Sequence, residues 1–510
     1  MNRSPVSSSD DFINADHLRD ELRGRSVRGG TAMMAAQGGR FALNLAATAV
    51  LARLLTPNDF GLIAMVVTVT GFISMFKDMG LSMATVQRDR IDHAQASALF
   101  WIILAFSGLI AIVTALSAPV VAWFYGDPRL LSIVPVFALG FVCSGLTVQH
   151  QALLRRRMLF PALAAIDLGG IVVGLAVGIG MALRGFGFWS LVGKQLGEQV
   201  GTMVGVWVAC RWRPGRPRGA SGLGSMLSFG GNLAGFNVLN YVSRNLDNVL
   251  LGWRFSPAIL AIYNEAYRLL YLPIQQINSP VSSVAIPALS RLQHEPERYR
   301  EYYRKGLGLV VALGMPAVGF MLAAADEIVL VVLGSQWLMV IPVFRLLGPA
   351  AFLGTFNMAA GWVYVSLGKT SRQLRWQLFG AAGMGLAFAI GLQWGVTGMA
   401  AACSIATLLL RYPALAFCYR GAPVGMIDLL HALWRPTLAS LGAAGLLWSA
   451  GQLAFVDGHP VLRLMVGAVL YAFFYLGAWM ILPGGRQWMM NSLRLVDELR
   501  GGAERREEGR

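Results

Sequence analysis

The chain is poor in the charged residues that a water-soluble protein of its size needs. Of its 510 residues only 13% are charged, whereas 56% are hydrophobic and the mean hydropathy is +0.57. Soluble domains usually carry about 25% charged residues. A chain this apolar cannot cover a water-facing surface with polar groups, so a string of soluble domains is excluded.

Cysteine and histidine are also scarce. The four cysteines show no CxxC spacing and lie in or at the end of apolar segments, so we expect small hydrophobic residues inside helices. The six histidines form no metal-ligand pattern, and no Walker A, HExxH or GxSxG motif is present. We therefore expect no ATPase or hydrolase activity, no metal and no other cofactor. The first ~30 residues lack an apolar core, so no cleavable signal peptide is expected.

Long apolar runs fill most of the chain. Runs of about 18 or more such residues can cross a hydrocarbon layer of ~30 Å as a helix. We predict spans at 31–53, 61–85, 96–122, 131–153, 159–183, 187–210, 223–252, 258–290, 303–324, 339–366, 374–393, 396–418, 433–453 and 461–483. The sequence thus predicts an all-α polytopic membrane protein of about 14 transmembrane helices. An even number places both termini on one side.

The net charge of +16 is explained by membrane orientation. With the N-terminus in the cytosol, 30 of the 42 lysines and arginines fall in cytosolic segments and 5 in outer segments. This is a strong positive-inside bias, and it places both termini in the cytosol. A nucleic-acid partner is accordingly not expected. Only the seven basic residues inside spans are therefore interpreted as evidence about the substrate.

A weak internal repeat indicates two lobes. LARLLTPNDFGLIAM near residue 51 is echoed by LGWRFSPAILAIYNEA near residue 251, and a basic Pro/Gly-rich linker separates them. We predict a cytosolic tail (1–30), an N-lobe of six spans (31–210), the linker (211–222), a C-lobe of six spans (223–418), two extra helices (433–483) and a cytosolic C-terminal tail (484–510). Two-lobed repeats around a central site are typical of transporters.

Glycine and proline patterns concern helix packing. Gly193, Gly197, Gly201 and Gly205 form a four-residue ladder, and Gly170, Gly174 and Gly178 form another on the preceding span. Such seams let helices approach closely in lipid. Three prolines interrupt 258–290, which we expect to kink.

Polar side chains inside the spans are the candidate functional residues, because each costs several kcal/mol unless it faces a cavity or a partner. In the first span Gln37, Arg40, Asn44 and Thr48 share one helical face. The seventh span repeats this with Asn237, Asn240, Arg244 and either Asp247 or Asn248, and the eighth carries Tyr263, Tyr267, Tyr271 and Gln275 beside Glu265 and Arg268. We predict a substrate cavity lined by Arg40, Asn44, Asn240, Arg244, Tyr267, Arg268 and Tyr271. Arginine forks match phosphate and carboxylate oxygens, and tyrosine rings suit sugars, so a phosphorylated or acidic glycan fits both.

Several of these charges have a second interpretation. Arg244–Asp247, Glu265–Arg268 and Lys194–Glu198 are spaced i,i+3 or i,i+4, so each pair could simply neutralise itself. Arg40 and Asp167 have no opposite charge within one turn of their own helices. Arg40 lies ~14 Å into its span, and we expect it to face a water-filled cavity. Coupling-ion or charge-pair candidates are Asp78, Asp167, Asp247, Glu265, Lys194 and Glu198.

Four stretches resemble a known family: LARLLTPNDFGLIAMV, DMGLSMATVQ, SRNLDNVLLG and YNEAYRLLYLPIQQINSPVSSVAIPALSRLQ. They resemble the Wzx-type polysaccharide flippases, close to the colanic-acid-exporter branch of the multidrug/oligosaccharidyl-lipid/polysaccharide (MOP) exporter superfamily, over roughly residues 30–483. The resemblance implies a flippase of the bacterial inner membrane. It would move undecaprenyl-pyrophosphate-linked oligosaccharide units from the cytosolic to the periplasmic leaflet for exopolysaccharide or lipopolysaccharide biosynthesis. It also implies alternating access driven by an ion gradient, membrane lipids as surroundings, and polymerase and export machinery as partners. The motif touches Asp78, Arg244, Asp247, Asn248, Glu265 and Arg268 without assigning roles to them.

Three other functions remain as alternatives. An ion-coupled antiporter of small organic molecules would favour an acidic cavity, whereas this one is mixed and contains arginines. A membrane polysaccharide polymerase or ligase would need a sizeable outer loop with catalytic groups, which the predicted topology lacks. A membrane scaffold would not need charged stripes inside its spans.

Overall fold

The computed structural model describes residues 22–74, 85, 91–216, 241, 245–452 and 459–487, and side chains within these ranges from residue 36 to 450 and from 459. The elements assigned in this part of the chain are helices, which confirms the all-α prediction. Seven of the helical segments are long and apolar enough to span a membrane. The chain is therefore a multi-pass membrane protein, while the number of fourteen spans stays a prediction.

The chain divides into two compact units. Unit 1 comprises Met1–Asn264 with Val332–Gln336, and unit 2 comprises Glu265–Val331 with Trp337–Arg510. The division falls inside helix α11 (Pro257–Arg291), which begins in unit 1 and continues in unit 2. The basic linker expected at 211–222 is described only to residue 216. The predicted lobe bounds and the internal repeat therefore stay predictions.

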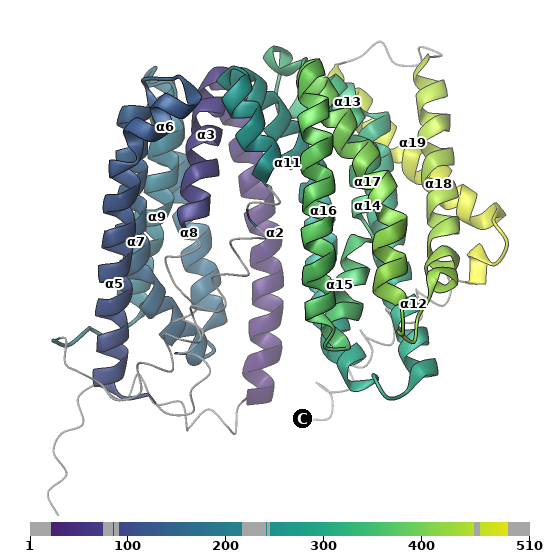
Figure 1. Cartoon of the computed structure of the whole chain (residues 1–510), viewed down its shortest axis with the longest axis horizontal. Coiled ribbons are helices and arrows are strands. Elements are labelled where there is room, and N and C mark those ends of the chain that lie inside the picture. The colour runs from purple at the N-terminus through teal and green to yellow at the C-terminus, as the bar shows by residue number, and fades with distance from the viewer. Residues whose placement is uncertain are drawn as a thin grey trace, which may run out of the picture. The chain divides into compact units, whose positions relative to one another are not determined.

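Unit 1 is a bundle of long helices (Figure 1). Its helices are α2 (Leu22–Leu54), α3 (Pro57–Ser74), α5 (His93–Leu116), α6 (Ala118–Tyr125), α7 (Leu130–Arg156), α8 (Phe160–Leu183) and α9 (Trp189–Ala209). The segment expected to span at 96–122 is interrupted at Ser117, where α5 ends and the short α6 begins with Pro119 in its first turn. Proline lacks a donor N–H and is tolerated at a helix start, so the chain restarts there.

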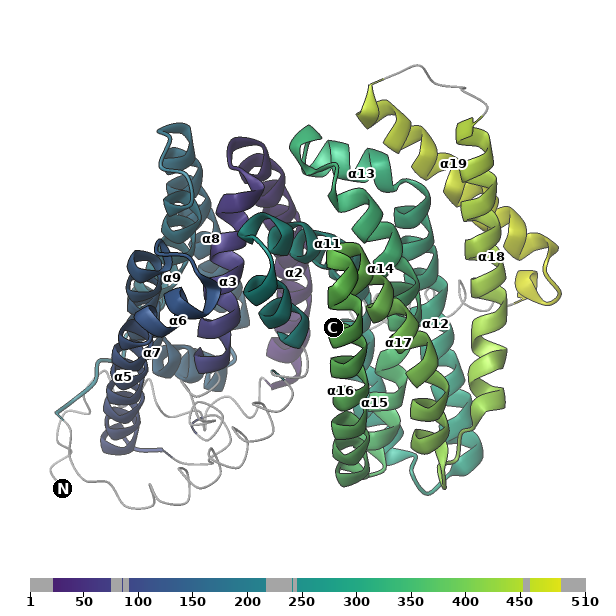
Figure 2. The same cartoon turned by 45° about the horizontal axis from the view of Figure 1, so that its top comes forward.

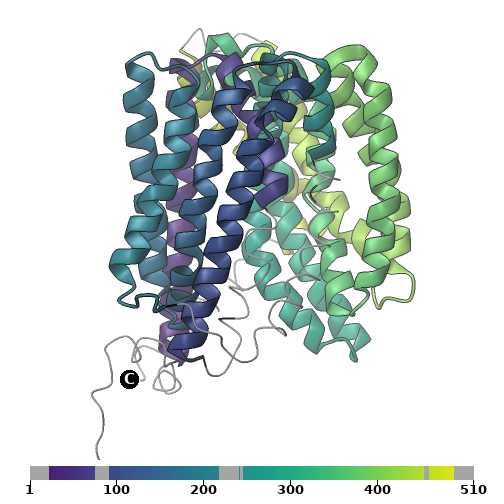
Figure 3. The same cartoon turned by 60° about the vertical axis from the view of Figure 1, so that its left-hand side comes forward.

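The glycine seam is confirmed in unit 1. Helices α8 and α9 pack along their length, as the two blue-teal helices at the left of Figure 3 show. A Cβ on Gly197 would lie 3.2 Å from the Cα of Gly174, and a Cβ on Gly201 would lie 3.2 Å from the Cα of Gly170. The missing side chains thus allow backbone-to-backbone contact, which supplies van der Waals attraction that lipid cannot replace.

Unit 2 contains the remaining described helices. They are α12 (Pro296–Ala323), α13 (Ala325–Val332), α14 (Val340–Gly354), α15 (Asn357–Ser366), α16 (Thr370–Gly391), α17 (Gly395–Tyr419), α18 (Met426–Gln452) and α19 (Pro460–Ile481). The predicted span 339–366 is broken between α14 and α15 at Thr355–Phe356. Helix α18 packs on α12, and α19 crosses α18 at an angle (Figure 2).

The core of unit 2 is aromatic, and several of its buried polar atoms are hydrogen-bonded to one another. The hydroxyls of Tyr303 and Tyr419 are 2.7 Å apart, and the indole N–H of Trp362 donates to Ser282 Oγ at 2.8 Å. A buried polar group without a partner would cost about 1–3 kcal/mol. These bonds therefore allow large aromatic side chains to be buried near the ends of α12, α15 and α17.

Candidate functional site

Arg40 and Asp167 are brought together in unit 1. An Nη1 of Arg40 on α2 lies 4.0 Å from Oδ2 of Asp167 on α8. Both side chains are about half exposed, at 52% and 43%. Neither residue has an opposite charge within one turn of its own helix. The packing of α2 against α8 supplies each with a partner on the other helix. At this distance and exposure the pair is a loose one, which leaves the guanidinium able to bind another anion.

The neighbours of Arg40 on the α2 stripe are hydrogen-bonded within their own helix. The amide of Asn44 donates to the carbonyl oxygen of Arg40 at 2.9 Å, and Thr48 Oγ1 donates to the carbonyl oxygen of Asn44 at 2.8 Å. Such bonds satisfy a polar side chain in lipid without a ligand. Arg40 is the charged member of the stripe, and its side chain reaches across to another helix.

A cavity of about 520 Å³ lies within unit 1 between α3, α7 and α9. Its wall includes Glu198, which pairs with Lys194 at 3.7 Å as the sequence spacing predicted. Other polar groups of the wall are Thr70, Ser144, Thr147, Gln151, Arg155, Gln195, Gln199 and Thr202. Sequence reasoning did not select Gln151, Gln195 and Gln199 as site residues. Three uncharged amides in or beside predicted spans were nevertheless a usable signal. Polar walls at membrane depth indicate water or a polar ligand.

Asp247 is held by a tyrosine. Tyr263 Oη donates to Asp247 Oδ2 at 2.9 Å, and the backbone N–H of Asn248 donates to Oδ1 at 2.9 Å. Both Asp247 and Tyr263 are buried in unit 1. Arg244, the expected i,i+3 partner, lies outside the described residues.

The tyrosine stripe of α11 forms a stacked pair in unit 2. The rings of Tyr267 and Tyr271 are 4.2 Å apart with an interplanar angle of 15°. Beside them Arg268 Nη1 pairs with Glu265 Oε1 at 3.3 Å, so the predicted i,i+3 pair is formed. Stacked rings present an apolar face with polar edges, which suits a sugar.

Arg411 on α17 is the residue that sequence reasoning missed. It donates from Nη1 to Asn357 Oδ1, and its Cζ lies 5.7 Å from the centre of the Phe356 ring. Within the described part of the chain its buried Nε has no hydrogen-bond partner and no carboxylate pairs with it. Arg411 also lies close enough to Tyr271 to interact electrostatically.

The break between α14 and α15 creates this arrangement. It delivers Phe356 and Asn357 to Arg411, while the Cβ that Gly354 lacks would lie 3.3 Å from the ring of Tyr271. Arg411 is about 12 Å from the end of α17 at Tyr419, by helical rise. A cation at that depth without a carboxylate is costly, so Arg411 is a candidate for anion binding. The sequence signal was an arginine inside the span 396–418.

Other predicted site residues cannot be placed. Asn240, Arg244 and Asp78 lie outside the described residues, as do Asn237 and Lys77. Among the residues that are described, no group of three or more His, Cys, Asp or Glu side chains could hold a metal ion. Cys210, Cys403 and Cys418 are buried, Cys143 is half-buried, and none of these four cysteines forms a disulfide with another described residue.

The chain is similar to several proteins of surface-polysaccharide synthesis. Residues 50–342 match the family model described as polysaccharide biosynthesis protein. The lipopolysaccharide biosynthesis protein WzxC of Escherichia coli (strain K12) is 23% identical over 414 residues, which cover 78% of this chain and 82% of WzxC. The teichuronic acid biosynthesis protein TuaB of Bacillus subtilis (strain 168) is 25% identical, with 60% of this chain and 64% of TuaB covered. The succinoglycan biosynthesis transport protein ExoT of Rhizobium meliloti (strain 1021) is 25% identical, with 61% and 63% covered.

Two solved structures share the fold. The lipid II flippase MurJ, in an inward closed conformation, superposes with a TM-score of 0.71 at 10% identity, covering 89% of this chain and 98% of MurJ. A multidrug resistance MATE family transporter of the MOP superfamily, in an inward-facing conformation, gives 0.58 at 16% identity, with 74% and 94% covered. At these identities the likeness shows the fold alone.

Proposed function

Since the chain belongs to the polysaccharide biosynthesis protein family, as its resemblance to the Wzx-type flippases predicted, we propose that it flips lipid-linked oligosaccharide units across the bacterial inner membrane. The substrate is an undecaprenyl-pyrophosphate-linked repeat unit that passes from the cytosolic to the periplasmic leaflet. Relatives named for lipopolysaccharide and succinoglycan synthesis support this substrate class.

One observation carries the proposal: an arginine without a carboxylate partner among the described residues stands beside stacked tyrosines inside unit 2. Arg411 supplies a positive charge for a phosphate, and the Tyr267–Tyr271 pair supplies flat faces for sugar rings. A lipid-linked saccharide contains both groups on adjacent atoms. The site therefore matches the junction between headgroup sugar and phosphate.

Transport rather than covalent chemistry is the proposed activity. Two lobes alternate access to a cationic site, and the substrate leaves unchanged. Arg40 and Arg244 offer further anion contacts along the path, whereas the carboxylates Asp78, Asp167, Asp247, Glu265 and Glu198 are the candidates for the coupling ion. Both termini lie in the cytosol, and the polymerase and export machinery receive the product.

The second candidate is an ion-coupled antiporter of small organic molecules. The fold likeness to a MATE transporter favours it, but the lipid II flippase shares the same fold. Substrates of the two classes differ in charge and in size. An arginine site selects anions, so organic cations should be poor substrates.

Deletion of the gene tests the proposal directly. The expected result is accumulation of a lipid-linked saccharide on the cytosolic leaflet, measured by lipid extraction and mass spectrometry. Arg411→Gln should reproduce this accumulation at wild-type membrane levels, while Arg375→Gln, which removes an exposed arginine on α16, should restore export. An unchanged lipid-linked saccharide pool in the deletion strain would overturn the proposed function.

A further inference from the structure

One end of unit 2 is crowded with basic residues, and four of them in the first turns of α12 are paired with carboxylates. This is the end at which α12 and α18 begin and α19 finishes, and the positive-inside pattern assigns it to the cytosol. The ion pairs here are Arg298–Glu295 at 2.8 Å, Arg300–Glu297 at 2.9 Å, Lys305–Glu301 at 2.7 Å, and Arg304 with Asp428. Each of these cations contacts a carboxylate at the start of α12 or on α18, and Arg304 and Lys305 also reach the pocket described next.

Arg435 on α18 differs from these paired cations. Its guanidinium carbon lies 4.9 Å from the ring centre of Trp434, and its buried Nε has no hydrogen-bond partner among the described residues. In the same part of the chain no carboxylate lies within 4.0 Å of it. A Cβ on Gly484, which adopts a φ of +73°, would lie 2.7 Å from Nη2 of Arg435. The turn after α19 therefore keeps room for the guanidinium.

A small pocket opens beside this arginine. Its volume is about 200 Å³, and it lies between α12, α18 and the end of α19. The polar groups lining it are those of Arg304, Lys305, His431 and Arg435, with Trp479 forming an apolar wall. Among the described residues that line the pocket there is no carboxylate. Its wall is thus basic and offers several N–H donors to a single anion.

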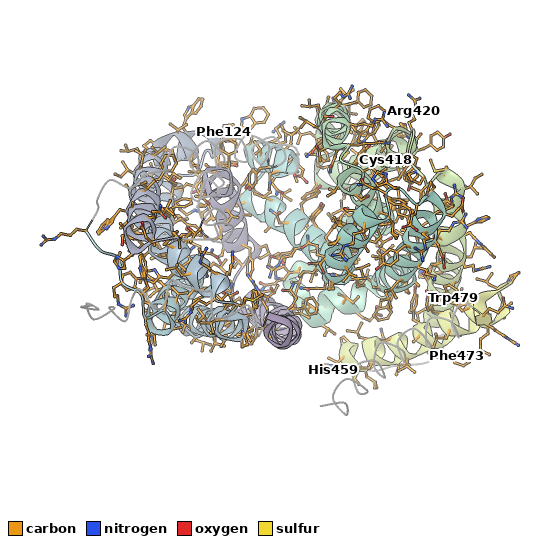
Figure 4. All side chains as sticks on the ribbon, turned by 90° about the horizontal axis from the view of Figure 1, so that it is seen from below. Phe124, Cys418, Arg420, His459, Phe473 and Trp479 are labelled. Atoms are coloured by element: carbon orange, nitrogen blue, oxygen red, sulfur yellow. The ribbon has the colours of Figure 1, made fainter. Side chains whose placement is uncertain are left out.

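The helices α18 and α19, which contribute to the pocket wall, also expose apolar side chains. Phe473 is 70% exposed and Ile481 84% exposed, whereas Trp479 is buried. Figure 4 shows Trp479 on the side of α19 that faces the bundle and Phe473 on the opposite side. Aromatic residues at this level, Trp434 and Trp479, are typical of the boundary between headgroups and hydrocarbon. A molecule in the pocket would have its acyl chains against exposed α18 and α19.

We propose that this pocket binds the phosphate of an anionic phospholipid headgroup, with Arg435 as the principal contact. The phosphate provides the negatively charged partner that Arg435 lacks among the described residues. Lys305 and Arg304 contribute further N–H donors at the rim of the pocket. Basic pockets between transmembrane helices on the cytosolic side are a known means of holding acidic lipids. A zwitterionic lipid brings its own cation, so it should bind less well.

Thermal unfolding of the full-length protein in detergent tests the proposal. Phosphatidylglycerol should raise the Tm of the wild-type protein more than phosphatidylcholine does at equal concentration. Arg435→Gln should make the two lipids equivalent. Arg298→Gln, which removes an exposed cation at the same end but outside the pocket, should keep the wild-type difference. Increasing salt should reduce the effect of phosphatidylglycerol.

Two further measurements distinguish other outcomes. Inorganic phosphate alone should leave the Tm unchanged; an equal shift would mean a free-anion site and overturn the lipid assignment. If Arg435→Gln does not fold, Arg435→Lys, which retains the charge but not the fork, should lose part of the shift, and native mass spectrometry of the wild-type protein should show retained phosphatidylglycerol. Equal retention of both lipids by the wild-type protein, or a full shift in Arg435→Gln, would refute the proposal.

Discussion

Replacing Gly174 with alanine is expected to force α8 and α9 apart. A Cβ at this position would lie 2.6 Å from the carbonyl oxygen of Lys194 and 2.9 Å from the Cβ of Glu198. Carbon atoms in favourable contact are about 3.5–4.0 Å apart, so the two backbones must separate by about 1 Å. The atoms in the way belong largely to the backbone and cannot rotate aside. Overpacking of this kind costs about 1–3 kcal/mol.

Two glycines of the same helix provide matched controls. A Cβ on Gly169 or on Gly180 would meet nothing within 4 Å. Alanine at an open helical position gains about 0.5–1 kcal/mol relative to glycine, since less backbone entropy is lost on folding. Gly169→Ala and Gly180→Ala should therefore unfold at or above the wild-type temperature.

The assay is thermal unfolding of the purified variants in the same detergent, followed by the loss of the monodisperse peak in size-exclusion chromatography. Gly174→Ala should unfold below the wild-type protein and below both controls. If Gly174→Ala were as stable as Gly180→Ala, the close approach of α8 and α9 would not contribute to stability and the reasoning about the seam would be wrong.

Three further predictions concern topology, a surface ion pair and transport. Cysteines placed at positions 216 and 332 should be labelled by an impermeant thiol reagent from opposite sides of the membrane; labelling from one side would contradict the fourteen-span topology. The hydrogen bond from Arg129 lowers the pKa of Asp127 in the loop before α7. The stability that this pair contributes is therefore present at neutral pH and is lost as the pH falls through the lowered pKa of Asp127. Arg129→Gln should accordingly flatten the acidic side of a plot of Tm against pH. An unchanged acidic side would contradict a stabilising role for this ion pair. Arg40→Ala should insert normally but reduce polysaccharide export in a deletion strain, and wild-type export would remove Arg40 from the substrate path.

The glycine ladders illustrate what could be predicted from sequence. Their four-residue spacing fixes one face of each helix before any tertiary contact is known, because the helical period is a local property. Lys194–Glu198 and Glu265–Arg268 were predictable for the same reason. Hydropathy likewise gave the helical class, since a bilayer requires continuous apolar helices.

Contacts between helices could not be obtained in this way. Arg40 and Asp167 each lacked a partner on their own helix, and only the packing of α2 on α8 joins them. Sequence separation of more than a hundred residues carries no local signal for such a pair.

The sequence by itself therefore determined the membrane class, the all-helical class, the glycine seam and the family of this protein, because each depends on local periodicity or on residue identity. Tertiary structure decided the surroundings of the charges that have no partner on their own helix. It paired Arg40 with a carboxylate, left Arg411 beside stacked tyrosines and left Arg435 beside a basic pocket. The physical reason is that the energy of a buried charge depends on the atoms around it in space, and those atoms come from helices far apart in the chain.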